Sequence, residues 1–209
     1  KAAGFALLIR FFNQIFGNMS EGMTNSWSAV NDLPWPELIA ILSAATMTLG
    51  NLVAIQQNNV KRMLAYSSIA HAGYMMMALP IMSNTSIEGI MMYLIKYLFM
   101  NLGAFFVVIY VNDQIGGEEF SHFDGLGWRM PIVGIAMTLF MVALTGLPPT
   151  AGFVGKFYIF AAVIEAGSKF YWLAFVGVIN SVVSLYYYIR VVKHMYLSGE
   201  RSDELVNPS

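Results

Sequence analysis

Cysteine is absent from this sequence of 209 residues, and charged residues make up only 11% of it. Without cysteine the chain has no disulfide, no thiolate metal ligand, no cysteine nucleophile and no cysteine-ligated iron–sulfur cluster. A soluble globular domain carries roughly 25% charged residues. Here 57% of the residues are hydrophobic and the mean hydropathy is +0.61. The composition therefore predicts a membrane protein.

The sequence also lacks a basic patch and the common cofactor motifs. Its formal net charge is -1, and its eleven Lys and Arg residues are scattered through apolar segments and short loops. Because nucleic-acid binding needs clustered positive charge, we exclude nucleic acid as a partner. The sequence contains no phosphate loop, dinucleotide fingerprint or haem-ligand pair, and no second ligand lies at metal-binding spacing from His71. We expect no cofactor and no metal in this chain.

Long apolar runs occupy most of the chain. A bilayer core of about 30 Å needs roughly 20 apolar residues of helix. We therefore expect an all-α polytopic membrane protein, with residues 1–209 forming one membrane domain of about six crossing segments. The first segment is incomplete at the start of the sequence. The segments cover, approximately, residues 1–17, 36–56, 62–83, 88–112, 130–166 and 170–196.

The segment 130–166 is too long for one straight crossing, because at 1.5 Å per residue it would measure about 55 Å. Its middle contains the sequence GLPPTAG, so we expect one crossing that is broken at residues 146–152. Counting it as two crossings would move Arg190 and Lys193 to the other side of the membrane. Broken helices are tolerated where their free backbone groups face protein or a water-filled cavity.

Charge is unequal between the two sets of loops. The loops after the second, fourth and sixth segments would share one side, and the other side keeps only Lys169. By the positive-inside rule the first side is cytoplasmic, and the alternating segments predict a multi-pass protein. This side carries Lys61, Arg62, Arg129, Arg190, Lys193 and Arg201.

Two loop-side regions are expected to meet solvent or the membrane interface. In the polar connector from Asp113 to Arg129, we expect His122 and Asp124 to be solvated. The run YYYIR at 186–190 is typical of an interfacial aromatic belt whose arginine extends to the cytoplasm.

Lys156 is the strongest candidate for a functional residue. It follows the expected break, in GFVGKFYIF, where Gly152 and Gly155 leave room beside the backbone. An ionisable side chain inside a membrane costs about 2.5–3.5 kcal/mol at a helix centre on insertion scales, so its presence indicates a function. Burial penalises the charged form of a lysine, which allows proton exchange near neutral pH. The alternative is a structural lysine that pairs with a loop carboxylate or extends to the interface.

Two further lysines have less certain surroundings. Lys1 heads the run KAAGFALLIRFF and is either a buried proton relay or an anchor at a helix start. Lys96 lies near the middle of MMYLIKYLFMNLGAFFVV, far from other charges in the sequence. It is either a relay residue or a lysine that faces a cavity or a carboxylate of an adjacent subunit.

His71 belongs to a polar stripe in the third segment. Spacings of three and four residues place Ser67, His71 and Tyr74 on one helix face. This face is either a set of interhelical hydrogen bonds or part of a path for protons or water.

Four runs of the sequence together resemble the antiporter-like subunit N of proton-pumping NADH:quinone oxidoreductase, which is respiratory complex I, and its plastid counterpart. The order and spacing of the runs match over essentially the whole chain. Wider relatives are subunits L and M of that complex and the multisubunit sodium/proton antiporters. The resemblance is carried by NNVKRMLAYSSIAHAGYMMMAL, YLFMNLGAFFVV, TGLPPTAGFVGKFYIF and LYYYIRVVKHMYL.

The resemblance implies a subunit of fourteen spans in two inverted five-helix units, of which this chain corresponds to spans eight to thirteen. It implies that Lys1 is the lysine of the eighth span, on the central hydrophilic axis. Lys156 would be the lysine of the discontinuous twelfth span, near the exit of the second half-channel. Asn101 stands where subunits L and M carry a lysine, and Lys96 matches no family residue.

Three functions remain open from the sequence. The first is an energy-coupling subunit, in which quinone reduction elsewhere in complex I changes protonation along Lys1, His71 and Lys156. Its partners would be the other membrane subunits, the lipid bilayer and protons, in a bacterial inner membrane or a plastid thylakoid. The second is a subunit of a multisubunit sodium/proton antiporter. The third is a structural membrane anchor, for which replacing Lys156 would be harmless.

Overall fold

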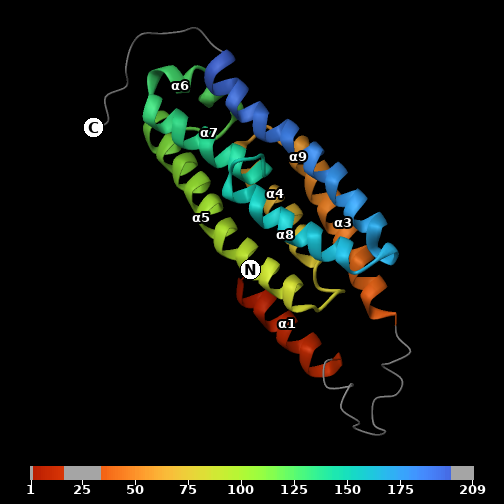
Figure 1. Ribbon diagram of the computed structural model, residues 1–209. Helices are drawn as coiled ribbons and strands as arrows, with labels where there is room; N and C mark the ends of the chain where they lie inside the picture. Colours follow the sequence, from red (N-terminus) through yellow and green to blue (C-terminus); the bar gives the residue numbers. More distant parts are fainter. Residues whose placement is uncertain (1, 17–33, 199–209) are drawn as a thin grey trace, which may run out of the picture.

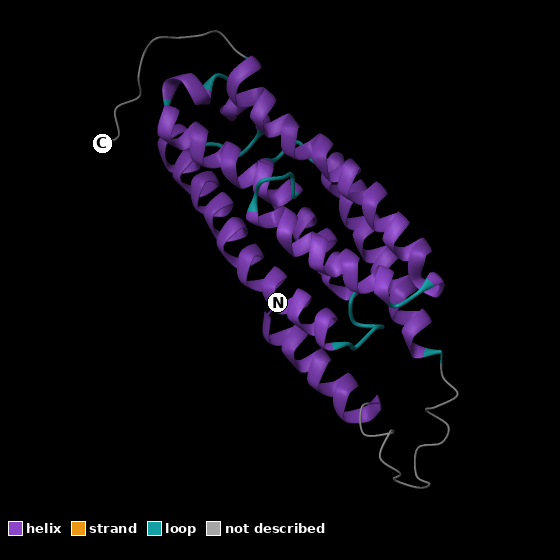
Figure 2. Cartoon of the chain, in the orientation of Figure 1, coloured by secondary structure: helices purple, strands orange, loops and turns teal. Residues whose placement is uncertain are grey.

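The computed structural model describes residues 2–16 and 34–198, which form an elongated bundle of helices (Figures 1 and 2). Two short 3-10 helices, η2 (Phe120–Phe123) and η3 (Ser168–Phe170), lie in the connections. The α-helices are α1 (Ala2–Phe16), α3 (Trp35–Ile55), α4 (Val60–Met76), α5 (Asn84–Ile115), α6 (Leu126–Arg129), α7 (Pro131–Thr145), α8 (Ala151–Glu165) and α9 (Tyr171–Leu197).

Three helical segments of the described chain are long and apolar enough to cross a membrane: α3, α5 and the continuous stretch Ser168–Leu197. A fourth crossing is possible if the stretch Phe120–Arg129 and α7, which meet at an angle of 119°, are counted together. The expected class of helical membrane protein is confirmed. The number of six crossings stays a prediction.

Helix boundaries differ from the expected segments mainly around α4 and α5. α4 ends at Met76 and residues 77–81 form turns, whereas the expected segment continued to residue 83. α5 begins after Ser83, whose hydroxyl accepts a hydrogen bond from the Ser86 amide at 3.1 Å. It continues to Ile115, three residues beyond the expected end, and stops at Gly116, which has a φ of 84°. Only glycine adopts this left-handed conformation without strain.

The closest helix packing lies between α3 and α4, where two glycines face the partner helix. A Cβ atom on Gly50 would lie 2.6 Å from the Ala70 amide nitrogen, and one on Gly73 would lie 2.6 Å from that of Met47. Small residues allow such close approach of helices in membranes, where van der Waals packing drives their association. α4 also packs against α5, α8 and α9, so this contact positions a central helix of the bundle (Figure 1).

One end of the bundle gathers two of the loops expected on the basic side and the last turns of α9. The Val60 amide donates a hydrogen bond to the Glu118 carbonyl at 2.8 Å, which joins the α3–α4 loop to the connector after α5. The Gly125 amide donates to the His194 carbonyl at 3.1 Å, which joins the same connector to α9. Two of the expected loops therefore lie together, and the third lies almost entirely outside the described residues. Their assignment to the cytoplasm stays a prediction.

At the opposite end, Lys169 forms an ion pair with Glu37 at the start of α3. Trp35 stacks on Phe12 of α1, with 5.1 Å between ring centroids and an interplanar angle of 22°. An aromatic pair beside a surface ion pair fits the boundary between lipid and water.

The connector between α5 and α7 is folded, and His122 and Asp124, which we expected to be solvated, are half-buried. Phe123 is fully buried, and Asp124 accepts a hydrogen bond from Nδ1 of His194 at 2.6 Å. Glu118 pairs with Lys61 at 2.5 Å. The hydrogen bond from Lys61 holds the pKa of the Glu118 carboxyl below its ordinary value. Apolar side chains within the acidic stretch explain the fold, because they bury against the helix ends.

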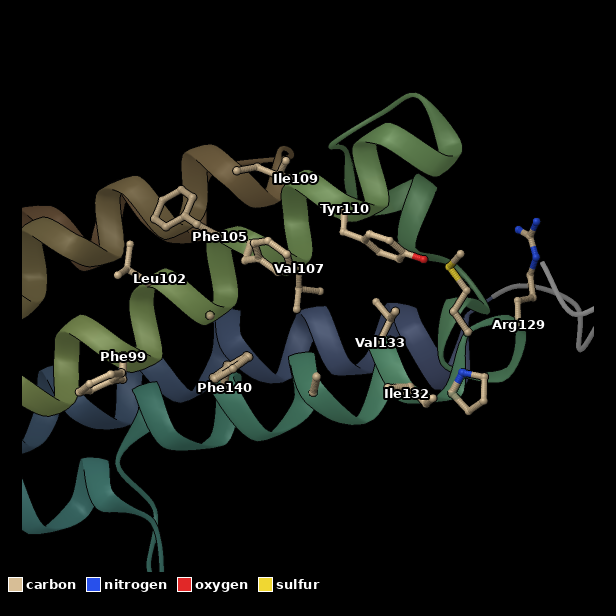
Figure 3. A pocket seen from close by; sticks show the side chains of 15 residues that line it. Phe99, Leu102, Phe105, Val107, Ile109, Tyr110, Arg129, Ile132, Val133 and Phe140 are labelled. Carbon is tan, nitrogen blue, oxygen red and sulfur yellow. The ribbon is translucent and has the colours of Figure 1, made fainter. Parts of the chain in front are cut away.

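The outer faces of α5 and α7 form an open apolar groove (Figure 3). Phe99 and Leu102 on α5 face Phe140 on α7 along it. Phe99 is 70% exposed and Ile132 is 84% exposed. Large exposed apolar side chains are unusual in soluble proteins but are expected where a helix meets lipid.

Candidate functional site

The site begins at the break between α7 and α8. Gly146 closes α7 with a φ of 81°, and the peptide bond between Pro148 and Pro149 is cis. A Cβ atom on Gly152 would lie 1.8 Å from the Ala143 carbonyl oxygen, so the first turn of α8 lies directly against the last turn of α7. The break falls within the expected residues 146–152 and leaves carbonyl groups at the end of α7 without helical partners.

Lys156 uses one of these carbonyls. It is only 5% exposed, and its Nζ donates hydrogen bonds to the Thr145 carbonyl and to Oγ of Ser181, each at 2.7 Å. The ammonium also lies 4.7 Å from the centroid of the Tyr74 ring, within range of a cation–π interaction. Lys156 is thus held by α7, α9 and α4 at once.

The partners of Lys156 are a carbonyl, a hydroxyl and an aromatic ring, and no carboxylate forms an ion pair with it among the described residues. The alternative of a lysine paired with a loop carboxylate therefore finds no support at this position. Neutral partners stabilise the ammonium less than a carboxylate would, so the lysine is not held in its protonated form. The Ser181 hydroxyl can accept a hydrogen bond from an ammonium and can also donate one to a neutral amine. The surroundings are compatible with both protonation states.

His71 lies at the centre of a second buried group. Its Nδ1 is 2.6 Å from Oη of Tyr93, and its Nε2 is 3.0 Å from Oη of Tyr188. A neutral imidazole carries a proton on one nitrogen only, so one tyrosine donates and the other accepts. The His71 ring is also 4.9 Å from the Tyr97 ring, between centroids. We call His71, Tyr93, Tyr97 and Tyr188 the histidine cluster.

The face predicted for α4 is buried: Ser67, His71 and Tyr74 are each at most 3% exposed. His71 makes interhelical hydrogen bonds, which was one of the two alternatives. A chain of hydroxyl and imidazole groups can also transfer protons, so the second alternative stays open. The Tyr74 ring lies between the two groups, 6.1 Å from the His71 ring and beside the ammonium of Lys156.

The expectation of an interfacial belt at 186–190 was wrong for two of its three tyrosines. Tyr187 and Tyr188 are each 1% exposed, whereas Tyr186 is 63% exposed. Three consecutive residues of a helix point in different directions, so they cannot all face the membrane interface. Arg190 at the end of the run donates to the Gln57 carbonyl at 3.2 Å, which fixes it to the α3–α4 loop.

A buried amide pair connects α3 and α9 beside these groups. Nδ2 of Asn51 donates to Oδ1 of Asn180 at 2.9 Å and to its carbonyl at 3.1 Å. Oη of Tyr187 donates to Oδ1 of Asn51 at 2.9 Å. Because Asn180 precedes Ser181 on α9, this pair orients the helix that holds the ammonium of Lys156. The sequence analysis did not identify these residues, although an asparagine within an apolar segment is a usable signal.

Lys96 lies close to both groups. Its Nζ is buried and has no hydrogen-bond partner among the described residues. A Cβ atom on Gly155 would lie 2.6 Å from this nitrogen, which places the lysine head against α8. The fourth candidate residue, Lys1, is outside the described residues. Its role stays a prediction.

These features define a polytopic helical membrane protein with a broken helix and a buried polar interior. The family model described as "NADH:quinone oxidoreductase/Mrp antiporter, TM" matches residues 7–184. The chain belongs to this family, and the predicted resemblance is confirmed.

Curated relatives carry the same family name. The chain is 54% identical over 205 residues to NADH-quinone oxidoreductase subunit N 2 of Sorangium cellulosum, covering 97% of this chain and 39% of the relative. It is 46% identical over 204 residues to NADH-quinone oxidoreductase subunit N of Anaeromyxobacter sp., and this match covers 95% of this chain and 39% of the relative. The chain thus spans about two fifths of the length of these relatives.

Solved structures give a similar result. The chain is similar to a chain of respiratory complex I from Thermus thermophilus, with 36% identity, a TM-score of 0.68, and coverage of 79% of this chain and 37% of that one. It is also similar to a chain of the membrane-bound sulfane sulfur reductase, an archaeal respiratory membrane complex. That match has 29% identity, a TM-score of 0.77, and coverage of 83% and 35%. A chain of the Mrp complex from Dietzia sp. shares the fold, at 23% identity and a TM-score of 0.73, covering 80% and 31%.

Proposed function

We propose that this chain belongs to a proton-translocating membrane subunit of an NADH:quinone oxidoreductase, and that Lys156 carries the proton. Family membership and the names of the curated relatives support the subunit. The observation that carries the role of Lys156 is its burial at the helix break with only neutral hydrogen-bond partners. The redox reaction lies in other subunits, and this chain contacts neighbouring membrane subunits and lipid in the inner membrane.

The protonated lysine donates to the Thr145 carbonyl and to the Ser181 hydroxyl. When the proton leaves, the Ser181 hydroxyl turns to donate to the neutral amine, while the Thr145 carbonyl keeps one N–H donor. The Thr145 carbonyl and the Ser181 hydroxyl thus keep a hydrogen bond to the lysine in both states. A positive charge that arrives nearby favours proton release, and its departure favours uptake.

The histidine cluster supplies the neighbouring part of the path. His71 connects hydroxyl groups from α5 and α9, and the Tyr74 ring separates this cluster from Lys156. A proton therefore passes from one group to the other beside Tyr74, when side-chain movement admits water. In this proposal Lys1 loads the path from the preceding part of the subunit, as the resemblance implies.

The test is NADH-driven proton uptake into inverted membrane vesicles, measured per electron on the intact complex with a sodium ionophore present. Lys156→Ala is compared with Lys193→Ala, which removes an exposed lysine from α9. We expect Lys156→Ala to slow proton uptake roughly tenfold or more, since a positioned acid–base group contributes about 10²–10⁴ to a proton-transfer rate. Lys193→Ala should pump normally.

The proposal fails if Lys156→Ala pumps as many protons per electron as the unmodified complex. Such a result would favour the structural anchor. If proton uptake depends on a sodium gradient, so that the ionophore abolishes the uptake, the sodium/proton antiporter alternative is correct instead.

A further inference from the structure

Lys96 differs from the other lysines that the structure describes within the bundle. Lys156 has two hydrogen bonds, and Lys61 and Lys169 pair with carboxylates near the helix ends. The Nζ of Lys96 is buried and has no partner among the described residues. A buried, unpaired amine destabilises a fold, so its retention calls for an explanation.

The orientation of Lys96 is also unusual for a membrane helix. A lysine in such a helix normally directs its charged head outward, toward the interface, and leaves its stem on the apolar surface. Here the side chain is only half-buried overall, yet its head is directed inward and lies against Gly155 of α8. The contact is possible only because residue 155 lacks a side chain, since a Cβ atom there would be 2.6 Å from Nζ.

Lys96 lines a narrow void that, as the structure stands, is too small for a water molecule. His71 and Tyr93 of the histidine cluster line one side of it, and Ala143 and Gly152 of the helix break line another. Met100 also lines the void, and its flexible side chain can move to admit water. The titratable groups of the packed elements near Lys96 are His71, Tyr93, Tyr97 and Lys156, and no described carboxylate pairs with it.

We propose that Lys96 is a second proton-exchanging lysine, which the histidine cluster loads across this void. This inference rests on the proposed function. The transfer starts from the protonated imidazolium of His71: its Nδ1–H gives a proton to the oxygen of Tyr93, and the Tyr93 hydroxyl gives its own proton to Nζ of Lys96 through water. The positive charge moves from the imidazole to the amine, and no other bond changes.

Lys96 lies against Gly155, the residue that precedes Lys156 on α8. The charge of each lysine therefore affects the other. Two ammonium groups in one apolar interior disfavour each other, so protonation of Lys96 promotes proton release from Lys156. Removing Lys96 should then change the pH dependence of proton uptake.

Three variants in the intact complex test the proposal: Lys96→Met, Lys96→Arg, and the control Phe99→Met on the lipid-facing side of α5. Methionine matches the apolar stem, and arginine keeps the positive charge but does not release its proton in proteins. The measurement is proton uptake per electron across a range of pH. We expect proton uptake per electron to fall about twofold or more in both Lys96 variants, since positioned proton carriers contribute large factors to transfer rates. The pH dependence of pumping should change in Lys96→Met.

Full uptake with an unchanged pH profile in Lys96→Met would overturn the proposal, as would full uptake in Lys96→Arg, which would make Lys96 a fixed cation. If Lys156→Ala loses pumping while Lys96→Met keeps it, this inference alone fails. If Lys156→Ala pumps normally, the proposed function fails first.

A second measurement covers the case in which Lys96→Met does not assemble. Residues 1–209 contain no cysteine, so Lys96→Cys creates the one thiol of this segment, and labelling is read on a proteolytic fragment that contains residue 96. A charged, water-soluble methanethiosulfonate should label it faster than it labels Phe99→Cys, if water reaches the void. Equal or slower labelling of Lys96→Cys would overturn the proposal.

Discussion

Gly73→Ala tests whether the close packing of α3 and α4 holds the candidate site in place. The added Cβ atom would lie 2.6 Å from the amide nitrogen of Met47 and 2.8 Å from its Cβ atom. Carbon atoms in contact prefer about 3.5–4.0 Å, so the two helices must separate by roughly 1 Å. The obstacle is backbone, which cannot rotate away as a side chain can.

We expect this substitution to destabilise the protein by about 1–3 kcal/mol, the usual cost of overpacking. The separation also lengthens the hydrogen bond from Oγ of Ser43 to the Gly73 carbonyl, now 2.8 Å. His71 lies two residues before Gly73 on the same helix, so its 2.6 Å contact with Tyr93 should weaken as well. Stability and proton uptake should therefore fall together.

The assay is thermal dissociation of the purified complex in lipid nanodiscs, followed by proton uptake in vesicles. Gly89→Ala is the matched control, because its Cβ atom would lie 3.5 Å from the nearest atom, an ordinary contact. In a helix, alanine is favoured over glycine by up to about 1 kcal/mol, so this control should be neutral or stabilising. Equal dissociation temperatures for Gly73→Ala and Gly89→Ala would refute the reasoning.

Two further substitutions test the polar contacts. Asn51→Leu removes two hydrogen bonds to Asn180 and one from Tyr187. At about 0.6 kcal/mol per interhelical bond in membranes, it should cost about 2 kcal/mol in a denaturant titration, and an unchanged midpoint would contradict this. Glu118→Gln removes the ion pair with Lys61 and should lower stability by less than about 1 kcal/mol at pH 7. Because the Glu118 pKa is depressed in the fold, this pair stabilises the protein above the ordinary carboxyl pKa, and the stabilisation is lost as pH falls through the lowered value. The difference in stability between Glu118→Gln and the unmodified protein should therefore disappear in acid. A stability difference that persists in acid would contradict this assignment to the ion pair.

The position of the helix break could be predicted from the sequence, because it depends on local chemistry. Gly146 and the two prolines that follow it end a helix through left-handed backbone and missing amide donors, whatever surrounds them. Lys156 was identified for a similar reason, since an ionisable group in an apolar run stands out without any knowledge of its neighbours. The polar face of α4 followed from helical spacing alone.

The partners of these groups could not be predicted in this way. Tyr93 and Tyr188 lie 22 and 117 residues from His71 in the sequence, and only the packing of three helices brings them together. The expected interfacial belt at 186–190 was wrong because the sequence shows where aromatic residues are but not which face of α9 meets protein.

Apolar length and motif order are properties of a linear chain, so they were enough to identify a helical membrane protein of a recognisable family. Which buried groups meet became known only from the folded bundle. It placed the ammonium of Lys156 on the Thr145 carbonyl and directed the head of Lys96 inward against Gly155. The physical reason is that burial and hydrogen bonding depend on contacts between helices, which the rotation and depth of each helix in the bundle decide.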